Sequence, residues 1–378
     1  MSPQIRTAHR TDSVRGILLD LLLCFFVAAS LPLGAQQAGP GQITPSSNGS
    51  VPISRARSDE SANQSNSVHA LKPEWMFSSD SDGNIRQLLR VGDDYAIGDR
   101  SRLGVLYRQE LIYNVASTSV TEKVREAGVI GEWHPNEVVK VEGMLGVSQT
   151  GGTAADTEGE TVPAATVPVS NAQATFTPVG DAFRFDLGFK RAIFDLSPQL
   201  VANRVVRNDL ILHPQLGLDS GWRFRELAEI GPVTMPGKSN NRYNSESTVA
   251  RQLAKNSELY TTLSMLHYRE ASDAGYFSPD LAQSLEGGWS TDLDRRVFSL
   301  SLDFGLGASR EREHGSTFGP WGIAGHSETD LTWRMGHGRE LRASYEYYYD
   351  QSTPAVESPG DGPWHMMILK VSFRWPSN

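Results

Sequence analysis

A histidine and a serine stand close together at His314-Gly315-Ser316, in a stretch that predicts a loop. Hydrolytic catalysis needs a nucleophile, a base and an orienting group in mutual contact. The other histidines considered for this role are scattered, mostly in predicted turns or near strand ends, at positions 213, 267, 326, 337 and 365. A solvated loop is the default interpretation of the pair, and a lipid- or protein-cleaving site is the alternative. We expect no catalytic residue.

Metal and cofactor chemistry is not indicated by the sequence. Cys24 is the only cysteine, and it lies in a predicted leader, so the mature chain is expected to lack thiols and disulfides. There is no His-Glu-x-x-His motif and no phosphate-binding loop. The acidic run at 80–84 has the spacing of a calcium loop, but Ile85 stands where that loop needs glycine. Asp82-Gly83 suits a two-residue hairpin turn instead, and we expect no cofactor.

Charged residues of both signs recur at alternate positions between apolar ones. They are Arg108, Glu110, Lys140, Glu142, Arg184, Asp186, Lys190, Asp303, Arg334, Arg342, Glu346 and Arg374, with the aromatic residues Tyr260, Tyr268, Tyr348 and Trp364 interspersed. One interpretation is the ordinary hydration of a water-filled interior. The other is a path for a neutral polar polymer, in which rings stack on sugar faces and charges bond hydroxyl groups.

The last stretch of the chain shows which elements would position these side chains. Apolar residues occupy its odd positions and polar residues its even ones: Met367, Leu369, Val371, Phe373 and Trp375 against Lys370, Ser372 and Arg374. Period two predicts a strand with one apolar and one polar face. A terminal strand of this kind, ending in an aromatic residue, is typical of an outer-membrane barrel. Such a barrel pairs its last strand with its first, because lipid cannot hydrogen-bond an open edge.

Similar alternation recurs upstream and predicts an all-β transmembrane antiparallel barrel of about 16 strands. From the middle of the chain onward, the connections alternate between short ones at 255–257, 292–295 and 336–339 and long ones at 271–281, 309–320 and 351–362. Short periplasmic turns and long outer loops produce this pattern and would place both termini in the periplasm. A soluble β-sandwich also has alternating strands and is the alternative, which extraction only by detergent would exclude.

The middle of the chain gives the weakest pattern. Leu200 to Leu212 and Leu216 to Ile230 are candidate strands in which the alternation slips. Gly231 to Asn241 is expected to be a loop. Strand registers between residues 196 and 241 therefore stay open.

Composition and the N-terminal segment indicate the destination of the chain. Hydrophobic residues make up 39% of the 378 residues, and the net charge of −9 argues against a nucleic-acid partner. Residues 1–35 combine arginines with an apolar run before Ala35, which predicts a signal peptide cleaved near that residue; a retained membrane anchor is the alternative. We expect a disordered periplasmic tail at 36–71, a barrel at 72–378 and location in the bacterial outer membrane, in contact with its lipid.

Gly275-Tyr276-Phe277-Ser278-Pro279, followed after a few residues by a predicted strand, resembles a signature of a known barrel. The resembling domain is the C-terminal barrel of the bacterial cellulose synthesis outer-membrane subunit, the operon's protein C. The run from Arg204 to Leu210 resembles a basic-then-polar run of the same domain. The resemblance implies an exit pore for an exopolysaccharide chain such as cellulose. That family carries an array of helical repeats before its barrel, so assembly with an inner-membrane synthase would here need a separate periplasmic helical-repeat protein.

Polysaccharide export is thus the expected function, with a general diffusion porin and an outer-membrane lipid or envelope hydrolase as alternatives. The candidate path residues are Gly275, Tyr276, Phe277, Ser278, Pro279, Arg184, Asp186, Arg342, Glu346, Tyr348 and Trp364. The alternative for Tyr276 and Phe277 is a loop anchor packed at the barrel rim.

Overall fold

The computed structural model describes residues 69–81, 83–114, 117–153, 163–178, 183–218, 221–272, 277–337, 339–351 and 364–377. The predicted signal peptide and most of the predicted tail lie outside these residues. The described part begins with β1 at His69, three residues before the expected start of the barrel.

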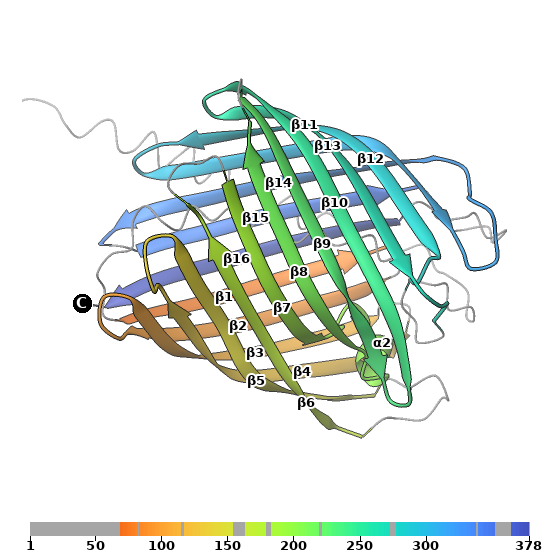
Figure 1. Ribbon diagram of the computed structural model, residues 1–378. Helices are drawn as coiled ribbons and strands as arrows, with labels where there is room; N and C mark the ends of the chain where they lie inside the picture. The colour runs from red at the N-terminus through yellow and green to blue at the C-terminus, as the bar shows by residue number, and fades with distance from the viewer. Residues whose placement is uncertain are drawn as a thin grey trace, which may run out of the picture. The chain divides into compact units, whose positions relative to one another are not determined.

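Sixteen strands account for most of the described residues (Figure 1). The first eight are β1 (His69–Asp80), β2 (Asn84–Ala96), β3 (Ser101–Asn114), β4 (Ser117–Trp133), β5 (Val139–Gly152), β6 (Ala165–Phe176), β7 (Phe183–Ile193) and β8 (Val206–Gly217). The others are β9 (Trp222–Met235), β10 (Lys238–Ala254), β11 (Ser257–Tyr268), β12 (Leu281–Asp294), β13 (Phe298–Arg312), β14 (Gly322–Gly336), β15 (Arg339–Asp350) and β16 (Trp364–Ser377). A short helix, α2 (Pro198–Ala202), lies between β7 and β8.

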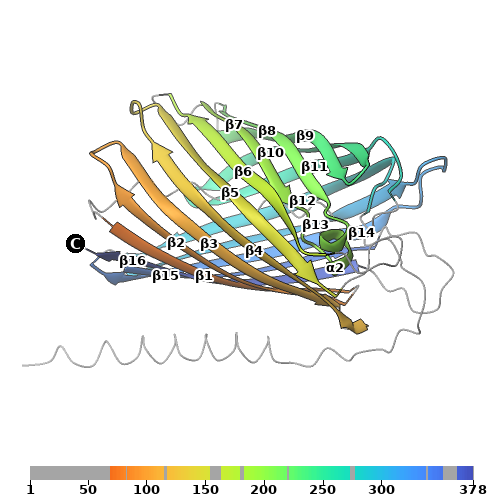
Figure 2. The same cartoon turned by 90° about the horizontal axis from the view of Figure 1, so that it is seen from below.

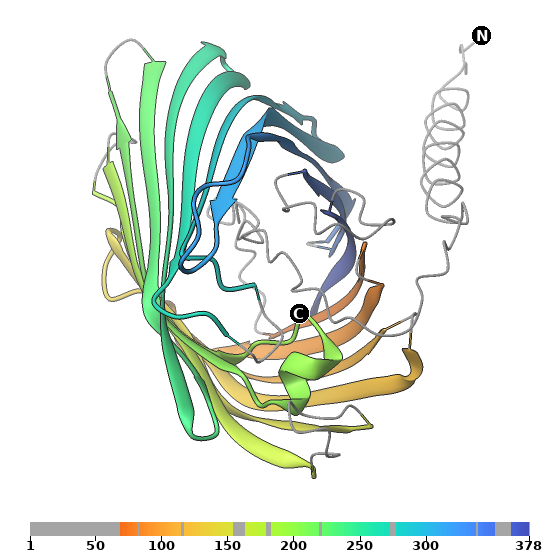
Figure 3. The same ribbon diagram turned by 90° about the vertical axis from the view of Figure 1, so that its right-hand side faces the viewer.

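The sheet closes on itself, since each strand pairs with its sequence neighbours and β1 pairs antiparallel with β16. At this seam Trp75 lies opposite Val371 and Phe77 opposite Leu369. Figure 2 shows β1 beside β16 and β2, and Figure 3 shows the ring of strands seen from one end. The predicted antiparallel barrel is therefore confirmed, and the two-sheet sandwich is excluded.

Side chains alternate between the outside and the inside of this ring. Ile112 of β3 and Val124 of β4 contact Val201 of α2, which lies within the ring in Figure 3, so the even positions of β3 and β4 face inward. Their odd neighbours face outward and are exposed apolar residues, among them Val105 and Val129. Apolar outward side chains and polar inward ones reverse the arrangement of a water-soluble protein.

The outward apolar face continues around the barrel. Leu145 is 74% exposed and Phe304 is 54% exposed, whereas inward-facing Glu110 is fully covered. Trp133 and Trp375 are exposed near the ends of β4 and β16, where membrane proteins carry aromatic residues at the interface with water. Within the described residues, none of the helical segments has the length and hydropathy needed to cross a bilayer.

The connections divide between the two ends of the barrel. We call the end that carries the β7–β8, β11–β12 and β13–β14 connections the loop end. The opposite end, where β1 begins and β16 ends, is the terminal end. The β10–β11 connection at the terminal end is confined to residues 255–256, while β11–β12 at the loop end covers 269–280, so the predicted alternation is confirmed there.

The structure corrects two expectations in the middle of the chain. Gly231 to Asn241 is not a loop, because β9 and β10 run through it and turn only at 236–237. Gly231 and Pro232 suggested a loop, but both stay in β9, opposite Arg242 and Asn241 of β10, and the register with β8 is the same on either side of them. A Cβ at Gly231 would lie only 1.6 Å from the Asn208 carbonyl oxygen, so glycine serves a close strand contact there.

Leu200 to Leu212 is not one strand either. Ser197 caps α2 by accepting a hydrogen bond from the Leu200 amide, and Pro198 occupies its first turn. The chain leaves the helix through Arg204, whose φ is 53°, and β8 begins at Val206.

Candidate functional site

The inward face of β2 to β4 carries a network of buried ion pairs near the loop end. Arg86 Nε donates to Glu110 Oε1 at 2.8 Å, and Arg108 pairs with both Glu110 and Glu126. Asp195, from the β7–β8 connection, completes the network, with Oδ1 3.1 Å from Arg86 and Oδ2 on Arg108. Two arginines of the wall thereby hold a carboxylate that enters from a loop.

Asp195 lies outside the strands. Its burial would raise the pKa of the carboxyl, but Arg108 and Arg86 outweigh this effect and lower the pKa of Asp195 far below its usual range. Asp195 is consequently an anion at neutral pH, and the connection is tied electrostatically to β2 and β3.

Apolar contacts hold the same connection against the wall. Val201 of α2 is fully buried against Ile112, Val124 and Val167, which face inward from β3, β4 and β6. Figure 3 shows α2 inside the ring of strands. The helix and its flanking residues therefore occupy part of the interior at the loop end.

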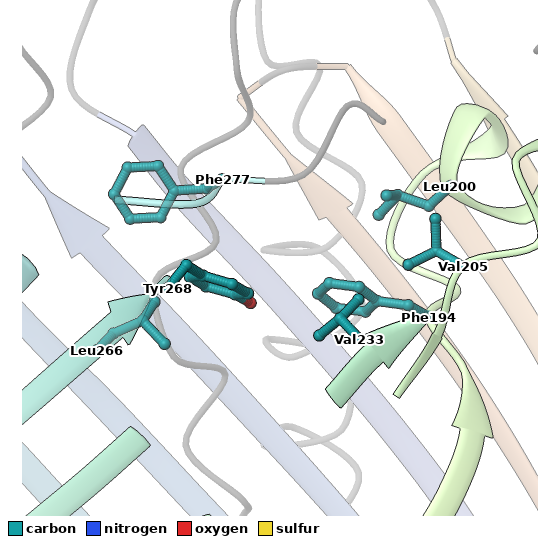
Figure 4. Packing of buried hydrophobic residues seen from close by; sticks show 7 residues of the cluster. All are labelled: Phe194, Leu200, Val205, Val233, Leu266, Tyr268 and Phe277. Carbon is teal, nitrogen blue, oxygen red and sulfur yellow. The ribbon is translucent and has the colours of Figure 1, made fainter. Parts of the chain in front are cut away.

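A second apolar cluster joins this connection to the β11–β12 connection (Figure 4). Phe194, Leu200 and Val205 come from the first connection and Phe277 from the second. Inward side chains of the wall fill the space between them: Val233, Leu266 and Tyr268. The Arg207 guanidinium lies 5.3 Å from the Phe194 ring centroid, which links the cluster to the charged wall. Two loop-end connections thus pack as one unit inside the rim.

Charged residues of β8 to β10 form another buried network. Arg242, which is 6% exposed, pairs with Glu229 at 2.8 Å and with Asp209 at 3.3 Å. Arg207 bonds the same two carboxylates, and Asn244 donates to Glu229. The two arginines and two carboxylates of this network make this part of the wall polar and close to neutral.

Acidic residues dominate the inward face of β13 to β15. Asp303 lies directly opposite Glu328, and Glu328 lies opposite Glu346, so three carboxylates stand in a row across three strands. Asp330, two residues along β14, faces the same way. We call Asp303, Glu328, Asp330 and Glu346 the acidic stripe. Like charges in directly opposed positions repel each other, so this arrangement lowers the stability of the wall.

Countercharge for the acidic stripe is partial. Lys370 Nζ lies 2.5 Å from Glu346, and the Tyr348 hydroxyl donates to the same carboxylate at 3.0 Å. Among the described residues, no cation lies within ion-pair distance of Glu328 or Asp330. Among the described residues, the stripe therefore holds more carboxyl groups than cations within ion-pair distance of them.

His326 and Tyr260 extend the stripe toward β11 and β12. The His326 ring nitrogens lie 2.8 Å from Glu286 Oε2 and 3.4 Å from Asp303 Oδ1, and Nε2 is 3.2 Å from the Tyr260 hydroxyl. A Cβ at Gly288 would lie 2.1 Å from the Tyr260 ring, and one at Gly305 would lie 2.5 Å from the His326 ring. Glycines therefore let both rings lie flat against the wall instead of projecting into the interior.

The structure separates the candidate path residues predicted from the sequence into several groups. Arg184 and Asp186 pair at 3.1 Å on the inward face of β7, with His213 beside them. Arg342 pairs with Glu340 on β15. Glu346 belongs to the acidic stripe and Tyr348 bonds it.

The five-residue signature lies in the β11–β12 connection. Phe277 is buried in the second apolar cluster, which is the position of a rim anchor. Ser278 accepts a hydrogen bond from the Ser272 amide, and Pro279 accepts one from Tyr268. Gly275 and Tyr276 lie outside the described residues, and Trp364 marks the start of β16.

Sequence reasoning missed three features of the interior: Asp195, α2 and the cross-strand row of carboxylates. A Ser197-Pro198 start was available as a local helix signal. The carboxylate row was not readable, because it depends on the register between β13, β14 and β15.

The loop that holds His314 and Ser316 shows no catalytic geometry. The Ser316 amide donates to the Glu313 carbonyl in a turn, and His314 Nε2 is buried without a hydrogen-bond partner. In the described part of the chain, no group of three or more His, Cys, Asp or Glu side chains is arranged to hold a metal ion.

Comparison with known protein families and with curated proteins found no match. Among solved structures, the chain is similar to a "Bacterial polysaccharide outer membrane secretin", with a TM-score of 0.59, 12% identity, and coverage of 83% of this chain and 100% of that one. The CymD monoaromatic hydrocarbon channel matches with a TM-score of 0.46 and 6% identity over 83% of this chain and 90% of that one. Acinetobacter baumannii OccAB1 matches with a TM-score of 0.42 and 8% identity over 81% and 95%. At these identities the likeness concerns the fold.

Proposed function

We propose that this protein is an outer-membrane pore through which an exopolysaccharide chain leaves the cell. The observation that carries the membrane placement is the inversion of the barrel, with large apolar side chains outermost and buried charges innermost. Apolar surface of this extent, closed around a polar interior, is stable in lipid and aggregates in water. A wall of sixteen strands is wide enough to enclose a water-filled passage.

The choice of a polymer as substrate is supported by the chemistry of the wall. Paired carboxylates and guanidinium groups line much of the interior and can exchange hydrogen bonds with sugar hydroxyls. Tyr260, Tyr268 and Tyr348 are buried in the wall, so hydrogen bonding takes precedence over the ring stacking suggested by the sequence. The fold is similar to that of a barrel whose printed name refers to polysaccharide.

Conductance of the reconstituted protein tests this proposal. The full-length protein in planar bilayers is expected to form a pore whose current is interrupted by soluble glucan oligosaccharides added on one side. Longer oligosaccharides should give longer interruptions, because more hydroxyl groups contact the wall. A pore that shows no interruption with any glucan would refute polymer export.

A general diffusion pore is the second candidate, and the acidic stripe is the observation that favours it. A wall with more carboxylates than cations attracts small cations into a low-dielectric passage. This candidate predicts cation-selective conductance that is insensitive to oligosaccharides. We assign no catalytic step, since the His314 loop lacks the contacts that hydrolysis needs.

For the whole chain we further propose a signal peptide cleaved near Ala35 and a periplasmic tail from residue 36 that ends before β1 at His69. We also propose that an inner-membrane synthase supplies the polymer through a separate helical-repeat protein. Fractionation of cells that express the tagged chain, with N-terminal sequencing of the mature protein, tests the first two. Copurification from cells that make the polymer tests the partners.

A further inference from the structure

Two cations project from the outer surface of the barrel where β4 approaches the loop end. Lys123 and Arg125 occupy odd positions of β4, which face outward with Val129. Both side chains are exposed. Neither forms an ion pair with any described residue. An unpaired charge facing hydrocarbon is expensive, so this level of the wall lies among headgroups.

The neighbouring strands add polar groups at the same level. Gln109 of β3 and Gln149 of β5 lie directly opposite Arg125 on its two sides, and both are exposed. Lys123 and Arg125 lie on the same face of β4, because side chains of a strand alternate between its two faces. Their Cα atoms are about 7 Å apart, which is twice the rise per residue of a strand. We call Gln109, Lys123, Arg125 and Gln149 the outer cationic patch. Lys123 is flanked by uncharged Leu111 and Gly151, so no carboxylate occupies its opposed positions.

Apolar side chains continue from the outer cationic patch toward the terminal end. Val105, Val129 and Leu145 follow one another across β3, β4 and β5 and are 58%, 51% and 74% exposed. Val147 lies beside them, opposite Ala127, and is 51% exposed. The surface therefore has a cationic head region above an apolar strip, which matches a lipid with an anionic headgroup.

Other outward arginines near the loop end already have partners within the chain. The Arg310 guanidinium lies 4.2 Å from the Phe318 ring centroid and 4.5 Å from that of Trp321, and it donates to Gln283. Arg312 pairs with Asp280 at 2.7 Å. These arginines anchor loops, whereas Lys123 and Arg125 remain available to a ligand.

We propose that the outer cationic patch binds the phosphate groups of a phosphorylated, multiply acylated glycolipid of the lipid A class in the leaflet around the loop end. Arg125 engages a phosphate through two guanidinium N–H groups, Lys123 supplies a point charge, and the two glutamines donate to sugar hydroxyls or phosphate oxygens. The acyl chains lie along Val105, Val129, Leu145 and Val147. The inference rests on the membrane placement of the proposed function and not on the polymer.

Native mass spectrometry of the full-length protein in detergent micelles tests the proposal, with hexa-acylated lipid A as the probe. Lys123→Gln/Arg125→Gln is expected to bind lipid A about tenfold more weakly than wild type. The matched control is Arg251→Gln/Lys255→Gln, which removes the same charge from the outer surface at the terminal end and should bind like wild type. Wild-type protein should bind dephosphorylated lipid A as weakly as the first variant binds lipid A.

Equal binding of lipid A by both double variants overturns the proposal. Equal binding of lipid A and dephosphorylated lipid A by the wild-type protein overturns it as well. Displacement of lipid A by an equal concentration of phosphatidylglycerol overturns the glycolipid assignment. The mobility of unboiled samples in SDS gels shows whether Lys123→Gln/Arg125→Gln folds. If it does not fold, the comparison of lipid A with dephosphorylated lipid A on the wild-type protein still tests the proposal. The effect of oligosaccharides on conductance is measured in a separate experiment. A result that refutes polymer export would therefore not change the interpretation of lipid A binding.

Discussion

Arg242 shows at the residue scale how the barrel interior tolerates charge. Its guanidinium is buried and bridges Asp209 and Glu229 across β8, β9 and β10. A buried pair adds little net stability compared with an apolar replacement, but the loss of one partner leaves an uncompensated charge. The wall therefore depends on complete networks and not on single ion pairs.

Arg242→Ala is expected to lower the free energy of unfolding by about 3 to 5 kcal/mol, because Asp209 and Glu229 are left with Arg207 as their shared cation and one buried negative charge is uncompensated. Reversible urea titration of the protein folded in lipid vesicles measures the change. The control is Arg223→Ala, whose side chain is 48% exposed and lies 3.7 Å from Glu258. That exposed pair should contribute about 0 to 1 kcal/mol. Equal losses in the two variants would contradict the network interpretation.

The acidic stripe makes a second prediction at this scale. Glu328→Gln/Asp330→Asn should lower the cation-to-anion permeability ratio by severalfold, because it removes two carboxylates that have no ion-pair partner among the described residues. Reversal potentials in a salt gradient measure the ratio. Glu137→Gln, in the exposed β4–β5 connection, should leave it unchanged. An unchanged ratio in the double variant would show that the stripe lies away from the ion path.

At the scale of elements, the β7–β8 connection is the part of the described chain that turns a plain barrel into one with a partly filled interior. It is docked by Asp195 on β2 and β3, by Val201 on β3, β4 and β6, and by Phe194 on the cluster that includes Phe277. Most of these contacts are with strands other than β7 and β8, so the position of the connection depends on the closed barrel.

The Asp195 ion pairs should keep this connection docked over a wide pH range. A carboxyl whose pKa is lower in the folded state contributes stability above its unfolded pKa of about 3.9 and loses it as the pH falls through the folded value. Because Arg108 and Arg86 lower the pKa of Asp195, docking should be as strong at pH 4 as at pH 7.

A spin label at Gln199→Cys, in a chain with Cys24→Ser, reports this docking. Its spectrum should be immobilised at both pH values in otherwise wild-type protein. Asp195→Asn should give a mobile component at both, since the two arginines then lack their carboxylate. Mobility that rises between pH 7 and pH 4 without that substitution would contradict the assignment of Asp195 as the anchor.

At the scale of the whole molecule, closure between β1 and β16 decides whether the barrel exists. Lipid offers no partner to an open edge, so all strands depend on the seam. Deletion of residues 364–378 should abolish the heat-modifiable mobility that folded barrels show in SDS gels. Deletion of Asn378 alone, which lies beyond β16, should preserve it. Folding of the longer deletion would contradict closure through this seam.

The alternation of apolar and polar residues by itself determined the class of fold and, outside residues 196–241, indicated the strands of the wall and their apolar faces. Met367 to Trp375 was readable as the closing strand, because period two is a local property of the chain. The same holds for Lys255-Asn256, whose hairpin turn follows from its flanking strands.

Tertiary structure alone decided what lies inside. Asp195 meets Arg86 across 109 residues, Glu328 faces Asp303 only through strand register, and α2 is a single turn stabilised by the wall it packs against. Gly231 and Pro232 signal a loop locally, yet their strand continues because hydrogen bonds of its neighbours hold it. Contacts between distant residues follow from closure and register, which no local periodicity encodes.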